Sequence, residues 1–340
     1  NPISLGTTIG FLDNAGKFSR FYEMADIRRE GEPQVIEQSA VVSRLFENEL
    51  KIISNSRENS IILFSADDSS TIYGFRYFDQ IRERKLASWF KWTLPGTIKY
   101  HCLLDDALYV VIENGSSREL LRMSIKMDSE TLSLSDNRVH LDYLMPTSGW
   151  TYNPSTNKST KAKPAGLNGN GNLAAYDIDD TASPPEAVGN YGLITVNGSN
   201  LELDGDWSGQ TFLIGYLYEM KITLPTIYYV TKESETFKAD TRSNTILHRV
   251  KVGFGPVGFY QVNLVRKGRS DWNEDFEITP ANLYNANSAG FADDDVLRTI
   301  PIYDRNTNAS LTIKSTHPAP ATIHNLTWEG VLNNNFYTRV

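Results

Sequence analysis

The chain has 340 residues, more than one hydrophobic core usually organises, so we expect about two or three domains. Hydrophobic residues make up 40% of the chain and charged residues 22%, a composition that supplies packed cores and excludes a disordered protein. The formal net charge is -8, from 41 acidic and 33 basic side chains. A protein that grips nucleic acid by its phosphates should be basic, so this balance argues against such a binder.

Cysteine content and apolar runs exclude further classes. The single cysteine, Cys102, excludes an intrachain disulfide framework and a multi-cysteine zinc site. The longest apolar run, residues 107–112, is far shorter than a membrane span. The chain opens Asn1-Pro2 without a methionine, a basic region or an apolar region, so we expect no signal peptide and a fragment or processed chain. These features predict a soluble protein compatible with a reducing compartment.

Helical periodicity is scarce and is best over residues 19–29. There, Phe21, Tyr22 and Ala25 fall about one turn apart before Gly31 and Pro33 would end a helix. We therefore expect a leading segment, residues 1–45, that contains one short helix.

Strand signals dominate the next hundred residues. Short β-branched and aromatic runs separated by turn residues predict strands at 50–53, 60–64, 71–78 and 87–94. The pattern then begins again at residue 98, and aligning 50–65 with 98–113 gives a repeat of roughly fifty residues with about four strands in each unit. This period matches β-propeller blades, so we predict two blades within residues 46–145, near 46–94 and 95–145. Two ordinary meanders are the alternative.

The second half of the chain divides by composition. Residues 146–190 are rich in Asn, Ser, Thr, Gly and Pro, which predicts a polar insertion or irregular loop. Residues 191–245 carry further β-strands that could complete the propeller. From residue 246 to 340 the period-2 alternation predicts a separate C-terminal antiparallel β-domain, with a hairpin turn at Gly255-Pro256. The predicted fold class is therefore mainly β, with partial propeller blades, a C-terminal β-domain and few helices.

Candidate chemical motifs all have simpler structural interpretations. The glycine pattern of residues 253–258 lacks the following helix that a dinucleotide site needs, so we interpret it as a turn. The acidic stretches at 177–180, 202–206 and 292–295 lack the EF-hand register and are interpreted as solvated turns. The histidines show no zinc-ligand spacing and no serine elbow occurs. We accordingly assign no catalytic, cofactor-binding or metal-binding residue, and expect no cofactor.

Trp89-Phe90-Lys91-Trp92 interleaves aromatic side chains with a cation, as a stacking platform for sugars or bases would. Strand alternation places Phe90 and Trp92 on one face, and we expect that pair to fill the space between neighbouring blades.

Several strings resemble one protein family. They are residues 19–24 (SRFYEM), 29–33 (REGEP), 37–45, 56–59 (SREN), 74–78 (GFRYF), 87–92 (ASWFKW) and the closing TWEG of residues 327–330. They are similar to the nozzle proteins of short-tailed bacteriophages (podoviruses), also called tail tubular protein B, and most of all to those of marine and cyanophage type. The resemblance covers both ends and much of the middle, and it corresponds to the C-terminal half of the family's full-length chains.

The resemblance implies a structural virion protein at the distal end of the tail, and no enzyme. Family members form a homo-hexameric tube below the adaptor (tail tubular protein A), with an incomplete propeller among β-rich domains. Tail fibres are a further candidate partner. Phage DNA would pass through the channel non-specifically during ejection into the bacterial host, so the tube would be a conduit or gate for DNA. An acidic lumen suits such a conduit, because it offers no phosphate clamps.

Two other functions compete with this one. Trp89, Trp150 and Trp207, if exposed, together with the abundant acids would suit a tail-associated protein that binds or hydrolyses host glycan. The third hypothesis is an interaction scaffold of propeller type unrelated to phage.

Overall fold

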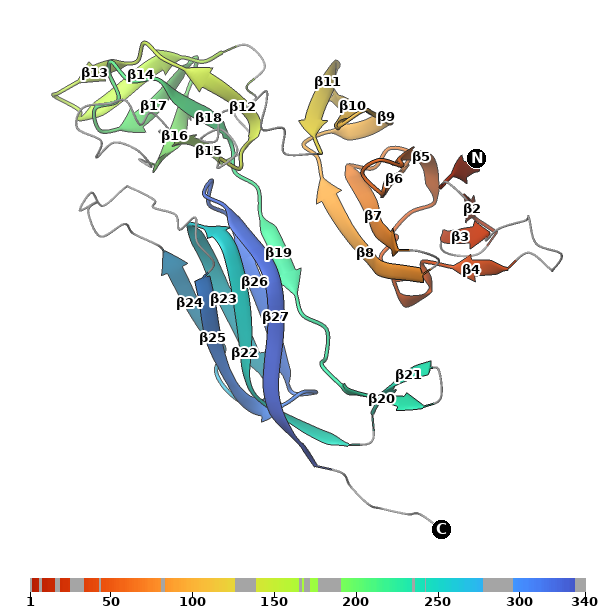
Figure 1. Cartoon of the computed structure of the whole chain (residues 1–340). Coiled ribbons are helices and arrows are strands. Elements are labelled where there is room, and N and C mark those ends of the chain that lie inside the picture. Colours follow the sequence, from red (N-terminus) through yellow and green to blue (C-terminus); the bar gives the residue numbers. More distant parts are fainter. Residues whose placement is uncertain are drawn as a thin grey trace. The chain divides into compact units, whose positions relative to one another are not determined.

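The computed structural model describes residues 2–5, 8–15, 19–24, 34–42, 44–80, 83–125, 139–164, 167, 172–176, 191–233, 236–241, 243–277 and 296–333. They form two compact units, Asn1–Thr131 and Leu132–Val340, hereafter unit 1 and unit 2. The elements are strands throughout, apart from one turn of 3-10 helix, η1 (Ala40–Val42), so the mainly-β prediction is confirmed (Figure 1).

Unit 1 consists of three antiparallel sheets that follow one another along the chain. The first sheet has the order β1-β2-β3-β4, the second β5-β6-β7-β8 and the third β11-β10-β9. Their bounds are β1 (Ile3–Ser4), β2 (Ile9–Asp13), β3 (Arg20–Met24), β4 (Val35–Glu37), β5 (Leu50–Ser56), β6 (Ile61–Ala66), β7 (Thr71–Gln80), β8 (Glu83–Thr93), β9 (Thr97–Leu104), β10 (Ala107–Asn114) and β11 (Ser117–Ser124).

The expected helix at 19–29 is wrong over its first half, because Arg20–Met24 is strand β3. Phe21 and Glu23 are buried on one face of the sheet, while Arg20 is exposed. A segment this short fits both a period of 3.6 and a period of 2, and pairing with β2 and β4 decides for the strand. Residues 25–33 lie outside the described part of the chain.

The second sheet is apolar on both faces, because it is covered on both. Ile62, Phe64 and Phe75 face the first sheet, where they join one core cluster with Phe21. Ile61, Leu63 and Ile72 face the third sheet and join another cluster with Leu108, Val110 and Ile112 of β10. This explains the continuously buried pattern of β6, which an ordinary two-layer strand would not show.

The third sheet corresponds to the second predicted repeat. Residues 61–64 and 108–112 lie in two separate sheets that pack against each other, as the face-to-face arrangement requires. Three strands are described here, and the fourth one expected before residue 145 falls partly on residues 126–138, outside the described ranges. Asp142–Thr147 pairs with a strand of unit 2, so the second repeat does not extend to residue 145.

Unit 2 begins with a seven-stranded sheet in the order β12-β18-β15-β16-β17-β14-β13. Its strands are β12 (Asp142–Thr147), β13 (Thr151–Asn153), β14 (Lys158–Ala162), β15 (Leu173–Tyr176), β16 (Tyr191–Asn197), β17 (Asn200–Asp204) and β18 (Phe212–Tyr216). The prediction of an irregular loop over 146–190 is wrong where the structure describes it. Its few apolar residues, among them Trp150 and Leu173, are buried in the core of this sheet. β16–β18, which the sequence pattern suggested as further propeller strands, belong to this sheet, where β16 pairs with β15, β17 with β14 and β18 with β12 and β15.

The rest of unit 2 is a sandwich of two sheets. One sheet has the order β19-β26-β23-β24 and the other β25-β22-β27, and a two-stranded ribbon β20-β21 lies outside both. The bounds are β19 (Met220–Thr223), β20 (Tyr229–Glu233), β21 (Thr236–Asp240), β22 (Asn244–Val257), β23 (Phe259–Arg266), β24 (Trp272–Glu277), β25 (Val296–Arg305), β26 (Ala309–Ser315) and β27 (Ala321–Asn333). Because β19 pairs with β26, this part begins before residue 246.

The predicted hairpin at Gly255-Pro256 is wrong. β22 and β23 lie in different sheets, so the chain crosses the sandwich there instead of turning back on itself. The register between β22 and β27 shifts between Phe254 and Val257, which leaves Pro256 at a bulge where its missing N–H costs no ladder bond. The glycine pattern therefore lies at the end of a strand, and no helix follows it.

Candidate interaction surfaces

The joint between the first and second sheets of unit 1 is aromatic. Trp89 of β8 packs against Phe75 at 4.7 Å and Phe46 at 5.3 Å between ring centroids, and Phe21 meets Phe64 at 5.0 Å. The indole Nε1 of Trp89 donates to the carbonyl of Gln38 at 3.1 Å. Trp89 is thus committed to the core between sheets. Phe90 and Trp92 pack into the other core, beside the third sheet, as their alternation predicts.

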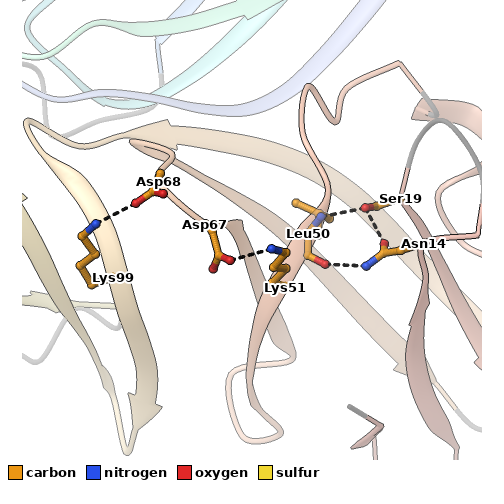
Figure 2. A network of polar contacts seen from close by, with 7 residues as sticks. All are labelled: Asn14, Ser19, Leu50, Lys51, Asp67, Asp68 and Lys99. Atoms are coloured by element: carbon orange, nitrogen blue, oxygen red, sulfur yellow. Dashed lines mark hydrogen bonds and ion pairs between the residues drawn. The ribbon is translucent and has the colours of Figure 1, made fainter.

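A partly buried polar network lies at the same joint (Figure 2). Ser19 Oγ accepts the Leu50 N–H at 2.8 Å and donates to Asn14 Oδ1 at 2.6 Å, while Asn14 Nδ2 donates to the Leu50 carbonyl at 2.9 Å. Ser19 and Leu50 are both almost fully buried. The first residue of β5 is therefore held to the first sheet through both of its backbone groups, with no unpaired polar atom in this triangle.

Ion pairs continue along the rim of the stack. Lys51 contacts Asp67 at 2.7 Å, and Lys99 of β9 contacts Asp68 at 2.7 Å, which ties the third sheet to the β6–β7 turn (Figure 2). Lys99 also meets Glu113 at 2.9 Å. The hydrogen bonds from Lys99 lower the pKa of Asp68 and of Glu113, and these carboxylates raise the pKa of Lys99. These groups are exposed, so the pairs orient the sheets and add little stability.

One serine–histidine pair lies between the second and third sheets. Ser54 Oγ and His101 Nδ1 are 2.7 Å apart, and burial lowers the pKa of His101 to about 4. His101 is 1% exposed and its Nε2 has no hydrogen-bond partner in the structure. The imidazole is neutral and shielded from solvent, with no third group to orient it, so we interpret the pair as part of the core.

The outer face of the third sheet, which points away from the second, is unusually apolar. Cross-strand register places four rows on it: a polar one, Thr97–Glu113–Arg118, and three mainly apolar ones, Tyr100–Val111–Leu120, Cys102–Tyr109–Arg122 and Leu104–Ala107–Ser124. Tyr100 and Leu104 are each 59% exposed and Leu120 is 69% exposed. A sheet face that meets water is normally polar, so within the described part of unit 1 this third-sheet outer face has the character of an interaction surface.

The outer face of the first sheet points away from the second sheet, at the opposite end of the stack of three sheets. Its rows are Ile9–Met24–Val35, Phe11–Tyr22–Glu37 and Asp13–Arg20, with the rings of Phe11 and Tyr22 stacked at 5.7 Å. A shallow hollow on this first-sheet outer face is lined by Phe11, Leu12, Asp13, Tyr22 and Val35. Val35 is 50% exposed. Unit 1 therefore presents two different apolar faces, one at each end.

The two tryptophans of unit 2 that were considered for glycan binding are buried. Trp150 and Trp207 are 3% and 6% exposed, and both pack against Phe212. Their Nε1 atoms donate to Thr147 Oγ1 at 3.1 Å and to the carbonyl of Asp204 at 2.9 Å. The expectation that they could be exposed is wrong, because the sheet curls around them.

The acidic stretches offer no metal site within the described ranges. The side-chain amide of Asn197 and then Lys158 donate hydrogen bonds to Glu202, which lowers the pKa of that carboxyl. Asp206 accepts two hydrogen bonds from Ser208. The part of the chain with assigned positions contains no cluster of three His, Cys, Asp or Glu side chains suited to an ion. Residues 177–180 and 292–295 lie outside it. Nor does any helix among the positioned residues have the length and apolarity needed to cross a bilayer.

Two solved structures that resemble the chain are remote likenesses. An exo-beta-1,3-galactanase from Phanerochaete chrysosporium with galactose has a TM-score of 0.22 and 9% identity over 93% of this chain and 64% of that chain. A variant of the same enzyme with beta-1,3-galactotriose has a TM-score of 0.23 and 10% identity over 97% of this chain and 95% of that one. TM-scores this low carry no argument about fold or activity. This chain spans about two thirds of the length of the first of these enzymes.

Family models give a different result. No curated protein sequence matches the chain. The model of the family described as "Bacteriophage nozzle protein", by contrast, matches residues 1–339, nearly the whole of it. The strings of residues 19–24, 74–78 and 87–92, which carry the resemblance, lie in β3, β7 and β8 of unit 1, where they build the sheet joints. The chain therefore belongs to the bacteriophage nozzle protein family, whose members are structural proteins of the phage tail.

Proposed function

We propose that this chain is part of a hexameric tail nozzle at the distal end of a short-tailed phage, below the adaptor, and that phage DNA leaves through its channel. The observation that carries the proposal is the family match over residues 1–339. Membership of this family supports a structural, non-enzymatic role.

The architecture of unit 1 supports a part in an assembly. Three sheets stacked by aromatic cores resemble the blades of an incomplete propeller, and both end faces remain apolar. A closed ring of identical subunits needs two different, complementary surfaces on each copy. Unit 1 offers such a pair of surfaces.

Electrostatics support a passive conduit. The net charge is -8, and several cations are already engaged by carboxylates, including Lys51, Lys99, Lys158 and Lys251. A DNA clamp needs free lysines and arginines, each of which releases counterions when it meets a phosphate. An acidic chain in which some of the cations are already paired offers fewer phosphate contacts, so DNA would slide past it without being held.

Electron microscopy of assembled phage tails, with a label fused to this chain, tests the location and symmetry. We expect six labels around the distal tail, below the adaptor. Labels on the capsid or on the fibres alone would refute the proposal.

Fluorescence anisotropy with double-stranded DNA tests the conduit role. We expect no binding at physiological salt up to about 100 μM protein, the weak end of the range of dissociation constants typical of non-specific binders. Submicromolar binding with a steep salt dependence would contradict it.

A further inference from the structure

We propose that unit 1 associates head to tail with a second copy of this chain, the first-sheet outer face of one copy docking on the third-sheet outer face of the next. This contact rests on the proposed ring function and specifies which surfaces would form the ring.

Sheet-on-sheet packing within unit 1 shows how such a contact would be built. The first sheet packs on the second through Phe21 and Phe75, and the second packs on the third through Leu63 and Val110. Each of these joints sets one three- or four-stranded antiparallel face against another. The two end faces also combine aromatic with aliphatic side chains, so a copy-to-copy contact would repeat an arrangement that the chain already uses twice.

Charge distinguishes this pairing from its alternatives. The first-sheet outer face carries the carboxylates of Asp13 and Glu37 around one guanidinium, Arg20. The third-sheet outer face carries Arg122 in its middle row and Arg118 beside Glu113 at one end. A symmetric dimer through the third sheet would bring arginine rows together, and one through the first sheet would bring carboxylates together. Only the head-to-tail pairing sets the acidic face against the basic one.

The size of the faces predicts a weak contact. A face of three strands about 4.8 Å apart and eight residues long covers roughly 14 by 27 Å, about 400 Å². A stable interface needs about 800 Å² on each partner. Isolated copies should therefore be mainly monomeric at low micromolar concentration, and a closed ring, in which every copy makes two contacts, would be far more stable than a pair.

Two variants test the proposal, each blocking one face with a buried charge. Val35→Asp blocks the first-sheet outer face and Leu120→Asp blocks the third-sheet outer face. Both side chains are at least half exposed in the monomer, so neither change should disturb folding. Leu193→Asp, at a residue of unit 2 that is 61% exposed, is the matched control.

Sedimentation velocity of the full chain at about 10 to 500 μM gives the readout. We expect wild type and Leu193→Asp to associate at the upper concentrations, and each blocked variant alone to associate at least about tenfold more weakly. An equimolar mixture of the two blocked variants should form 1:1 dimers and nothing larger, because each retains the face that the other lacks.

Three results would overturn the proposal. Self-association of Leu120→Asp or Val35→Asp at wild-type strength would show that the contact is symmetric or lies elsewhere. A mixture that stays monomeric would exclude the head-to-tail pairing. A wild-type chain that remains monomeric at 500 μM, about the concentration at which a sub-millimolar contact must show, would mean that another segment or another protein covers these faces. None of these results bears on where the chain lies in the phage, so failure of the contact and failure of the tail role remain distinguishable.

Discussion

Removal of one hydroxyl, in Ser19→Ala, should loosen the joint between the first and second sheets. The Leu50 N–H donates to Ser19 Oγ at 2.8 Å, and Leu50 is fully buried, so the amide loses its acceptor with no route to water. An unpaired buried donor costs about 1–3 kcal/mol. Asn14, which loses the other bond of Ser19, is exposed and can be hydrated at little cost.

We therefore expect the free energy of unfolding of unit 1 to fall by about 2 kcal/mol, which lowers its melting temperature by about 8 °C for a unit of this size. Hydrogen-exchange mass spectrometry on peptides from β5 is the most direct assay. If opening of the joint limits exchange, the Leu50 amide should exchange about 30-fold faster.

Ser117→Ala is the matched control, because Ser117 is exposed and its Oγ donates to the Asn114 carbonyl at 3.0 Å in a turn. Its effect should stay within about 0.5 kcal/mol. A loss below 0.5 kcal/mol in Ser19→Ala, with unchanged exchange at Leu50, would refute the reasoning and show that the amide finds another acceptor. Asn14→Ala and the double variant Ser19→Ala/Asn14→Ala complete a double-mutant cycle. The losses in unfolding free energy of the two single variants should be less than additive, because their hydrogen bonds form one network.

Further predictions concern the cores and the absence of turnover. Gly74→Ala should cost about 1–3 kcal/mol, because the new Cβ would lie 2.0 Å from Phe90 Cζ; Phe90→Leu should recover part of this loss in urea denaturation, and strictly additive losses would contradict the clash. His101 has its pKa lowered to about 4 by burial, so its stabilising effect is complete above pH 6.5 and is lost as the pH falls toward 4. His101→Asn should therefore flatten the fall in stability between pH 7 and 5, whereas an unchanged slope would assign acid sensitivity to the carboxylates. Purified protein incubated with host envelope or capsule should release no saccharide, and release abolished by mutating a specific pair of acids would establish a hydrolytic function.

The sequence alone determined where the strands of the second sheet lie. The runs at 50–53, 60–64, 71–78 and 87–94 overlap β5–β8 in order, because side-chain alternation and turn residues are local properties. The face assignment of Phe90 and Trp92 followed from the same alternation. The short sequence motifs along the chain also predicted the phage nozzle family, and the match of the family model confirms that prediction.

Pairing between strands was decided by the tertiary structure. At Gly255-Pro256 two alternating runs joined by a turn look like a hairpin, yet the strands belong to opposite sheets of a sandwich. The polar stretch after residue 146 contributes few apolar side chains to a core. Two of them, Trp150 and Leu173, are buried because they pack against strands that come later in the chain. Local sequence does not encode which distant partner a strand will find.

The candidate surfaces show the same division. Alternation predicts that Tyr100, Cys102 and Leu104 share a face of β9, but not whether another sheet covers that face. In β6 both faces are buried, because a sheet covers each of them, while on β9 Tyr100 and Leu104 are mostly exposed. Exposure is a property of the assembled layers, because a residue loses contact with water only when a second surface is brought against it, and that surface comes from elsewhere in the chain or from another molecule.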